Sequence, residues 1–296
     1  MKLRIGLAGK GFVGDAVARR LNELGYELEI TSLSLGTDFT KAEVVEEFVK
    51  RNDLVIQMFA IADLNHFEEK PLLGMNTNVW STVLFANYCS KYKKRLCYIS
   101  TACVYGNTPD LPSNEESRCN PSEIYAEAKL AGEHIIKGYA KSYDLNYLIL
   151  RIATVYGPEM RSSLAPAVFL GQILSGEPVT IHGSGDQTRT LTYIDDVADG
   201  IVAGVEYAAN QDKIQETINI SSEEELSVRD WVRIICEVTG KLTFPQSVDD
   251  RKGQTYREYI SSTKAMTLLN WRAKHSFKEG IEKTYKWMVE VWDGRW

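Results

Sequence analysis

The sequence predicts an α/β fold in which a doubly wound parallel sheet carries a smaller, interleaved α/β lobe. Two observations predict the sheet: short apolar runs alternate with helix-length amphipathic segments through residues 3–150, and a glycine-rich turn at residues 9–14 joins the first run to the first helix. A third observation predicts the lobe, because beyond residue 157 the alternation continues in shorter and more polar segments. Together these features indicate a Rossmann domain with an attached lobe.

The expected elements follow one another in a regular order. In the first half, strands are expected at residues 3–8, 27–33, 53–62, 96–100 and 146–150, and helices at 13–24, 41–50, 76–92 and around 125–129. In the second half, helices are expected at 164–175, 196–207, 228–239 and 276–292, and strands at 179–182, 191–194, 217–220 and 256–260. We expect residues 1–157 and about 187–209 to form the Rossmann domain, and residues 158–186 and 210–296 to form a substrate-binding lobe.

Composition excludes several classes of protein. The net charge of −6 over 296 residues argues against general nucleic-acid binding, which needs a basic surface. The start of the chain lacks the apolar core of a signal peptide, and no apolar run is long enough to span a membrane. Five scattered cysteines fit reduced thiols in a cytoplasm, and four isolated histidines predict no metal site.

The glycine-rich turn predicts a dinucleotide site. A strand, a turn rich in small residues and a helix, in this order, let the backbone approach a pyrophosphate whose charge is favoured at the helix N-terminus. The residues expected to bind the cofactor here are Gly9, Lys10, Gly11, Phe12, Val13 and Gly14.

The end of the second strand bears on the choice of cofactor. In NAD enzymes a carboxylate there binds the adenine ribose, but Ser32 occupies this position and no acid stands beside it. The absence of an acid permits a 2′-phosphate, and Lys10 could supply the matching positive charge. NADP(H) is therefore favoured and NAD is the alternative, as is a merely solvent-exposed Lys10. Asp38 is placed to meet the adenine edge or to form a turn.

Three polar side chains predict proton-transfer chemistry. Tyr125 and Lys129 are four residues apart, so on a helix they share one face, and the ammonium would lower the phenol's pKa. Tyr125 would then serve as a general acid or base. Thr101 follows a buried strand, where its hydroxyl could donate to a substrate oxygen. The alternatives are an exposed helix face for the pair and a strand-capping role for the threonine.

With these residues in place, the chain resembles the extended short-chain dehydrogenase/reductases, the NAD-dependent epimerase/dehydratase family of nucleotide-sugar enzymes. The resemblance covers almost the whole length, in blocks at residues 9–14, 78–82, 100–106, 125–129, 151–158, 189–196 and 217–220. It implies that Tyr125 is the catalytic acid/base, that Lys129 also holds the nicotinamide ribose, and that Thr101 binds the sugar C4 oxygen. It also implies a nucleotide-diphosphate sugar as substrate and a homodimer built through two helices of each subunit.

The resemblance assigns further binding residues and shows where this chain departs from the family. Phe59, Ala60 and Asn78 would line the cofactor, and Thr154, Arg189 and Arg251 the substrate, with Arg257 as a second candidate for the later arginine. Residues 57–60 replace the usual His-x-Ala-Ala. Ala102 and Cys103 stand where 4,6-dehydratases carry Asp-Glu, which argues against a dehydratase.

Two reactions use the same three catalytic residues. A 4-ketoreductase would transfer hydride from NADPH to a nucleotide-linked 4-keto-hexose, and a 4-epimerase would oxidise and re-reduce C4 with bound NAD. Lys10 and Ser32 favour the reductase narrowly. Cys103 is either a substrate-contacting cysteine or a buried structural thiol. A non-catalytic dinucleotide sensor is the third interpretation, disfavoured because Thr101, Tyr125 and Lys129 are all present.

Overall fold

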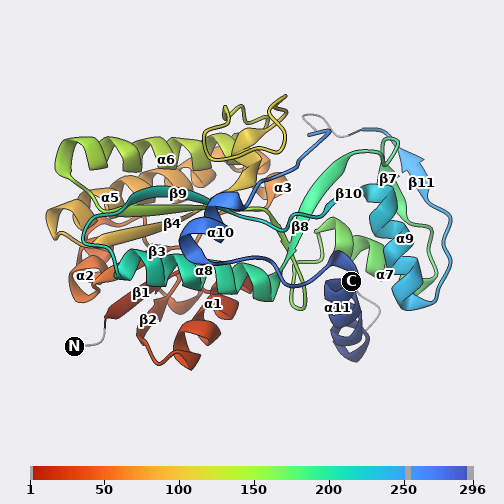
Figure 1. The fold of residues 1–296 in the computed structure, drawn as a ribbon, viewed down its shortest axis with the longest axis horizontal. Coiled ribbons are helices and arrows are strands. Elements are labelled where there is room, and N and C mark those ends of the chain that lie inside the picture. The colour runs from red at the N-terminus through yellow and green to blue at the C-terminus, as the bar shows by residue number, and fades with distance from the viewer. Residues whose placement is uncertain (1–2, 251–254, 292–296) are drawn as a thin grey trace.

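The computed structural model describes residues 3–250 and 255–291. The molecule is elongated, with one large sheet and its helices at one end and the smaller lobe at the other (Figure 1). None of the helices within these residues is long and apolar enough to cross a membrane.

The large sheet has six parallel strands in the order β2-β1-β3-β4-β5-β9. Their bounds are β1 Arg4–Ala8, β2 Glu27–Thr31, β3 Leu54–Gln57, β4 Arg95–Thr101, β5 Tyr147–Ile152 and β9 Gln215–Ile220. The chain leaves β1 toward β2 on one side and then crosses to β3 on the other. This reversal makes the carboxyl ends of β1 and β3 the topological switch point, where open α/β sheets bind their ligands.

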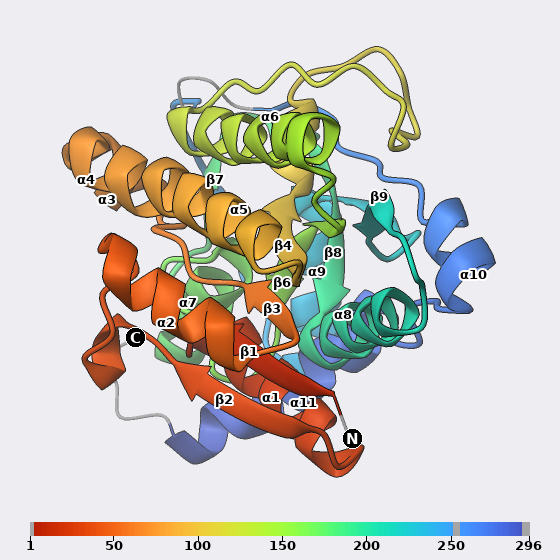
Figure 2. The same ribbon diagram turned by 90° about the vertical axis from the view of Figure 1, so that its left-hand side faces the viewer.

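Helices cover both faces of this sheet, which confirms the doubly wound α/β prediction (Figure 2). One face carries α2 (Ala42–Arg51), α5 (Ser81–Lys91) and α6 (Ile124–Tyr143), and the other carries α1 (Phe12–Glu23) and α8 (Ile194–Ala209). The strands are apolar on both sides because both faces are covered, and their side chains divide between two buried clusters.

Within the described residues, the lobe contains two small sheets and three helices. The three-stranded sheet has the order β10-β8-β6, and the two-stranded sheet pairs β11 with β7. The strands are β6 Thr154–Tyr156, β7 Thr180–His182, β8 Thr188–Tyr193, β10 Glu225–Ser227 and β11 Gln246–Val248. The helices are α7 Ala165–Ser175, α9 Val228–Thr239 and α11 Phe277–Val291, while α10 (Thr263–Leu269) packs beside α8 and β9 (Figure 1).

Several boundaries differ from the expected ones. The helix expected at 76–92 begins earlier, as α4 (Pro71–Met75), and passes through a π-helical turn at Asn76–Trp80 before α5. The strand expected at 256–260 is wrong: this segment makes only two isolated bridges, Thr188 with Arg257 and Ser113 with Ile260. Its pairing is split between two different neighbours, so no continuous ladder forms.

The division into domains also differs at two strands. Residues 215–220 were expected in the lobe, but β9 hydrogen-bonds to β5 as the sixth strand of the large sheet. Residues 188–193 were expected in the Rossmann domain, but β8 lies in the three-stranded sheet of the lobe. The chain therefore returns to the large sheet after β8 and leaves it after β9, both later than the composition of its segments indicates. We keep the rest of the division as a proposal.

Candidate active site

The glycine turn after β1 is shaped for close approach of a ligand. A Cβ at Gly9 would lie 2.5 Å from the backbone nitrogen of Phe59, and one at Gly14 would lie 2.2 Å from the carbonyl oxygen of Gly9. A Cβ at Gly11, in contrast, would meet nothing within 4 Å. Helix α1 begins directly after Gly11 without a side-chain cap. The turn thus presents an uncapped helix N-terminus to an open space, which fits the pyrophosphate of a dinucleotide.

Two of the residues expected around the adenosine half of the cofactor, Ser32 and Asp38, hydrogen-bond to residues close to them in sequence. Lys10 is exposed, whereas Ser32 is buried and its hydroxyl hydrogen-bonds to that of Ser34 at 2.8 Å. Oδ1 of Asp38 accepts hydrogen bonds from the backbone nitrogen and the hydroxyl of Thr40, which hold the pKa of Asp38 below its usual value. Asp38 therefore forms a turn, as in the second of its two expected roles.

The side chain of Asn78 hydrogen-bonds to the loop that follows β3. Its Oδ1 accepts from the backbone nitrogen of Ile61 at 2.9 Å, and its Nδ2 donates to the carbonyl of the same residue at 3.1 Å. This pair of bonds fixes the loop after β3, which carries Phe59 and Ala60. The ring of Phe59 stacks on Phe39 with centroids 5.2 Å apart, so an aromatic cluster supports this loop.

Two of the three expected catalytic residues, Thr101 and Tyr125, meet at the carboxyl end of β4, and the third, Lys129, lies one turn along α6. Thr101 is the last residue of that strand and is buried, and its hydroxyl accepts from the backbone nitrogen of Cys103 at 3.2 Å. Tyr125 is half-buried in the first turn of α6, with its ring edge-on to Phe67. Lys129 lies one turn further along and is only 3% exposed. The hydroxyl of Thr101 lowers the pKa of Tyr125, so the two side chains interact directly.

The electrostatics of the pair differ from the expectation. Burial raises the pKa of Tyr125, and Cys103 adds to the rise, while Arg161 and Thr101 oppose it. Burial lowers the pKa of Lys129 to about 7, opposed by Glu133. Nζ of Lys129 lies over the ring of Tyr98, 4.3 Å from its centroid. The positive charge that lowers the phenol's pKa is therefore that of Arg161, where we had expected that of Lys129.

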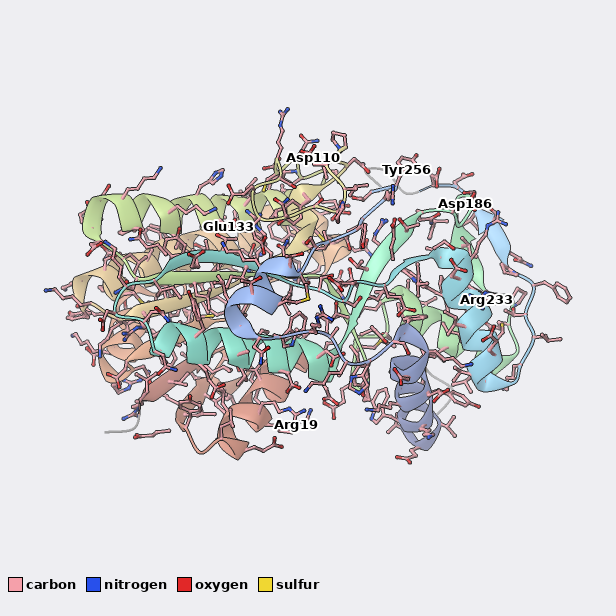
Figure 3. The ribbon with its side chains drawn as sticks, in the orientation of Figure 1. Arg19, Asp110, Glu133, Asp186, Arg233 and Tyr256 are labelled. Atoms are coloured by element: carbon pink, nitrogen blue, oxygen red, sulfur yellow. The ribbon has the colours of Figure 1, made fainter. Side chains whose placement is uncertain are left out.

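A buried charged network supports Lys129 from the next turn of α6. Glu133 lies on this helix (Figure 3) and accepts two hydrogen bonds from Arg151, at 3.0 and 2.7 Å, and one from Ser100 at 2.6 Å. Nη1 of Arg151 also donates to the hydroxyl of Tyr105 at 2.9 Å. The network joins α6, β4 and β5 beneath the site. Sequence reasoning missed it, although the spacing of Lys129 and Glu133 was a usable signal.

The residues expected to bind substrate lie on different elements of the structure. Arg189 lies on β8, and its charge lowers the pKa of the Cys103 thiol. Burial, with a contribution from Glu258, outweighs this effect and raises the pKa of Cys103 to about 12, so the residue is a neutral thiol. Thr154 is half-buried on β6 and pairs with Leu191 of β8.

Of the two arginines, Arg251 and Arg257, that are candidates for a second substrate-binding arginine, only Arg257 lies within the described residues. The guanidinium of Arg257 donates to both carboxylate oxygens of Glu225, at 2.7 and 2.9 Å, so it is already paired. Arg251 lies outside the described residues. Sequence reasoning also missed Glu123, whose charge acts on Tyr125, and the buried Glu258, because neither follows a strand or a motif.

A dinucleotide cradle at the switch point of a parallel sheet, with Thr101, Tyr125 and Lys129 beside it, defines an enzyme of hydride-transfer chemistry. The sequence profile described as "NAD dependent epimerase/dehydratase family" matches residues 7–221. The chain belongs to this family of NAD-dependent nucleotide-sugar enzymes.

Relatives and solved structures cover nearly the whole chain. A putative UDP-glucose 4-epimerase of Methanocaldococcus jannaschii is 29% identical over 95% of this chain and 96% of its own length. The UDP-glucose 4-epimerase of Thermotoga maritima, solved with UDP-glucose, superposes with a TM-score of 0.89 at 26% identity, covering 98% of this chain and 99% of that one. The UDP-glucuronic acid 4-epimerase of Bacillus cereus, solved with UDP-glucuronic acid and NAD, gives the same TM-score and identity over 98% and 100% of the chains.

Proposed function

We propose that this protein is a nucleotide-sugar 4-epimerase that works with tightly bound NAD. The observation that carries the proposal is that the hydroxyl of Thr101 acts on Tyr125, with Lys129 buried one helical turn further along α6. Ala102 and Cys103 stand where a dehydratase has carboxylates. Full-length similarity to 4-epimerases supports the epimerase over the reductase. The order of preference drawn from the sequence is therefore reversed.

The chain's own residues hold the sugar and move the proton of its C4 hydroxyl group. NAD, when bound, accepts hydride from C4 and returns it to the other face of the ring. Tyr125 takes the proton of the C4 hydroxyl and gives it back, and Thr101 hydrogen-bonds the same oxygen. Tyr125 sits in the first turn of α6, where the helix dipole and the charge of Arg161 favour the phenolate against the effect of burial.

Lys129 is proposed to hold the nicotinamide ribose, and Arg189 the substrate. With a pKa of about 7, Lys129 changes its charge near neutral pH, and Glu133 is the partner that favours its ammonium form. Arg189 is proposed to bind the diphosphate, because a guanidinium fork suits that group. Arg251 is the further candidate. The named UDP-sugar ligands of the solved relatives favour UDP as the nucleotide.

A second candidate is an NADPH-dependent reductase of a nucleotide-linked 4-keto sugar. It is favoured by the absence of an acid beside Ser32 and by the exposed Lys10 in the glycine turn. Both features suit a 2′-phosphate.

Identifying the dinucleotide in freshly purified protein separates the two candidates. Denatured protein should release NAD, and the intact protein should interconvert UDP-glucose and UDP-galactose without net redox change. Release of NADP, with NADPH consumed only when a 4-keto sugar is added, would establish the reductase instead.

Tyr125→Phe is the companion variant. It should abolish turnover and leave dinucleotide binding intact, because the phenol carries the proton and only its hydroxyl is removed. Tyr139→Phe is the matched control, since Tyr139 is half-buried on the same helix and its ring packs on Tyr143. Turnover by Tyr125→Phe equal to that of this control would remove the proposed role.

A further inference from the structure

Glu258 carries a buried carboxyl group, one oxygen of which has no hydrogen-bond partner among the described residues. Its side chain is 8% exposed, and Oε1 makes no hydrogen bond with any described residue. An unpaired buried carboxyl oxygen is costly, so such groups mark places where something else supplies the partner. The residue requires an explanation that the catalytic chemistry does not give.

The segment that carries Glu258 is firmly attached on both sides. The backbone nitrogen of Tyr256 donates to Asn107 Oδ1 at 2.8 Å, and its carbonyl accepts from the nitrogen of Thr188 at 3.0 Å. Figure 3 shows Tyr256 on this crossing, between the loop of Asp110 and the lobe. The backbone nitrogen of Glu258 donates to the carbonyl of Thr188, also at 3.0 Å. These backbone hydrogen bonds fix the position of the segment and therefore of the carboxyl group that it carries.

Strand alternation sets the direction in which Glu258 points. Arg257 pairs with Thr188 as a parallel bridge, and the side chains of both bond to Glu225, so they lie on one face. Because successive side chains of extended strands point to opposite faces, Arg189 and Glu258 lie together on the other face. Glu258 therefore neighbours the arginine that we expect to bind the diphosphate.

Charges from the other side of the site reach the same carboxyl group. Glu258 raises the pKa of Cys103, just beyond β4. Arg189 lowers the pKa of Glu258, and Glu123, at the start of α6, raises it. Burial is the largest cause and brings the pKa of Glu258 to about 7. The carboxyl group thus lies within electrostatic reach of Arg189 on the lobe side and of Cys103 and Glu123 beside the catalytic residues.

We propose that Glu258 determines substrate specificity by accepting a hydrogen bond from a hydroxyl group of the sugar and by excluding nucleotide-linked uronic acids. The inference rests on the proposed function, because it requires a nucleotide sugar in the site. A uronate would bring a second carboxylate close to Glu258, while Arg189, the nearest positive charge, is engaged by the diphosphate. A neutral hexose meets no such repulsion, and a hydroxyl supplies the partner that Oε1 lacks.

The test is a binding comparison on the intact, NAD-loaded protein. Calorimetry measures the affinity of UDP, UDP-glucose and UDP-glucuronic acid for the wild type, Glu258→Gln and the control Glu223→Gln, an exposed residue near β10. At pH 8, above the pKa of Glu258, the wild type should prefer the neutral sugar by at least about tenfold, and Glu258→Gln should reduce that preference about tenfold. Glu223→Gln should leave it unchanged, and the affinity for UDP should be the same in all three proteins.

The outcomes separate this inference from the function on which it rests. An unchanged preference in Glu258→Gln, with UDP binding intact, would overturn the specificity role alone. Loss of turnover in Glu258→Gln with all affinities unchanged would overturn it too, by making Glu258 an acid/base group. Failure of the wild type to bind UDP would count against the proposed function and, with it, this inference. Normal binding and discrimination without epimerisation would count against the function only.

Discussion

Replacing Lys129 with methionine tests how far burial destabilises the charged lysine. The side chain is 3% exposed, and burial lowers its pKa from 10.5 to about 7. The folded-state pKa is the lower one, so the unfolded chain binds more protons between pH 7 and 10.5. Stability should therefore rise with pH across this window and be at its lowest below pH 7.

The shift sets the size of the effect. At about 1.4 kcal/mol per pKa unit, the buried lysine costs the folded protein about 4 kcal/mol at pH 7 and about 2 kcal/mol at pH 9. Methionine keeps an apolar stem and removes the titration, but it loses the contact of Nζ with the ring of Tyr98 at 4.3 Å. Lys129→Met should therefore be more stable than the wild type at pH 7, by about 1–3 kcal/mol. It should also lack turnover.

Urea unfolding of dinucleotide-free protein at pH 7, 8 and 9, followed by tryptophan fluorescence, measures this effect. The stability difference between variant and wild type should shrink by about 2 kcal/mol from pH 7 to pH 9. Groups that titrate in both proteins, such as the buried thiols, cancel in the difference. Lys141→Met, at an exposed position on the same helix, is the matched control and should change stability by less than about 0.5 kcal/mol.

The reasoning is refuted if Lys129→Met is less stable than the wild type at pH 7. A difference that stays constant from pH 7 to pH 9 would refute it as well, because the lysine would then titrate alike in the folded and unfolded chains. Glu133 does not confuse the comparison, since Arg151 and Ser100 still bond to it in the variant.

Three further predictions concern the cofactor and substrate sites. Gly14→Ala should destabilise the protein by about 1–3 kcal/mol, because its Cβ would lie 2.2 Å from a carbonyl oxygen. Gly11→Ala should mainly weaken dinucleotide binding, because its Cβ would meet nothing within 4 Å. Equal free energies of unfolding in urea for the two variants would contradict this prediction. Lys10→Ala should weaken NADPH binding more than NADH binding in fluorescence titrations, and an equal effect would remove the case for a 2′-phosphate contact. Discrimination against UDP-glucuronic acid should increase as pH rises through about 7, where Glu258 ionises in the presence of Arg189, Glu123 and Cys103. If calorimetry gave the same ratio of UDP-glucose affinity to UDP-glucuronic acid affinity at pH 6 and at pH 8, this prediction would be excluded.

Features encoded by local sequence were predicted well. Gly9 and Gly11 lie between β1 and α1, and Gly14 lies in the first turn of α1. Backbone crowding at Gly9 and Gly14 leaves no room for a Cβ, which is why the sequence pattern shows this turn. Tyr125 and Lys129 share a helix face because their spacing is one turn. The family, the fold class and the meeting of Thr101 with Tyr125 follow from such patterns.

Features that depend on long-range packing were not predicted. The Glu133–Arg151 pair joins residues 18 positions apart, and its effect on Lys129 depends on burial that no local pattern encodes. Glu258 was missed for a similar reason, since its direction follows from the bridge between its neighbour Arg257 and Thr188, which are 69 positions apart. The homodimer and the cytoplasmic location stay predictions.

The central claim is that hydride leaves and returns to one carbon, the sugar C4, without an added reductant. Incubating the purified protein with UDP-glucose deuterated at C4, with no added dinucleotide, and analysing the product by NMR and mass spectrometry tests it directly. We predict UDP-galactose that keeps the deuterium at C4. Product that has lost the deuterium, or no conversion until NADPH and a 4-keto sugar are supplied, would contradict the account.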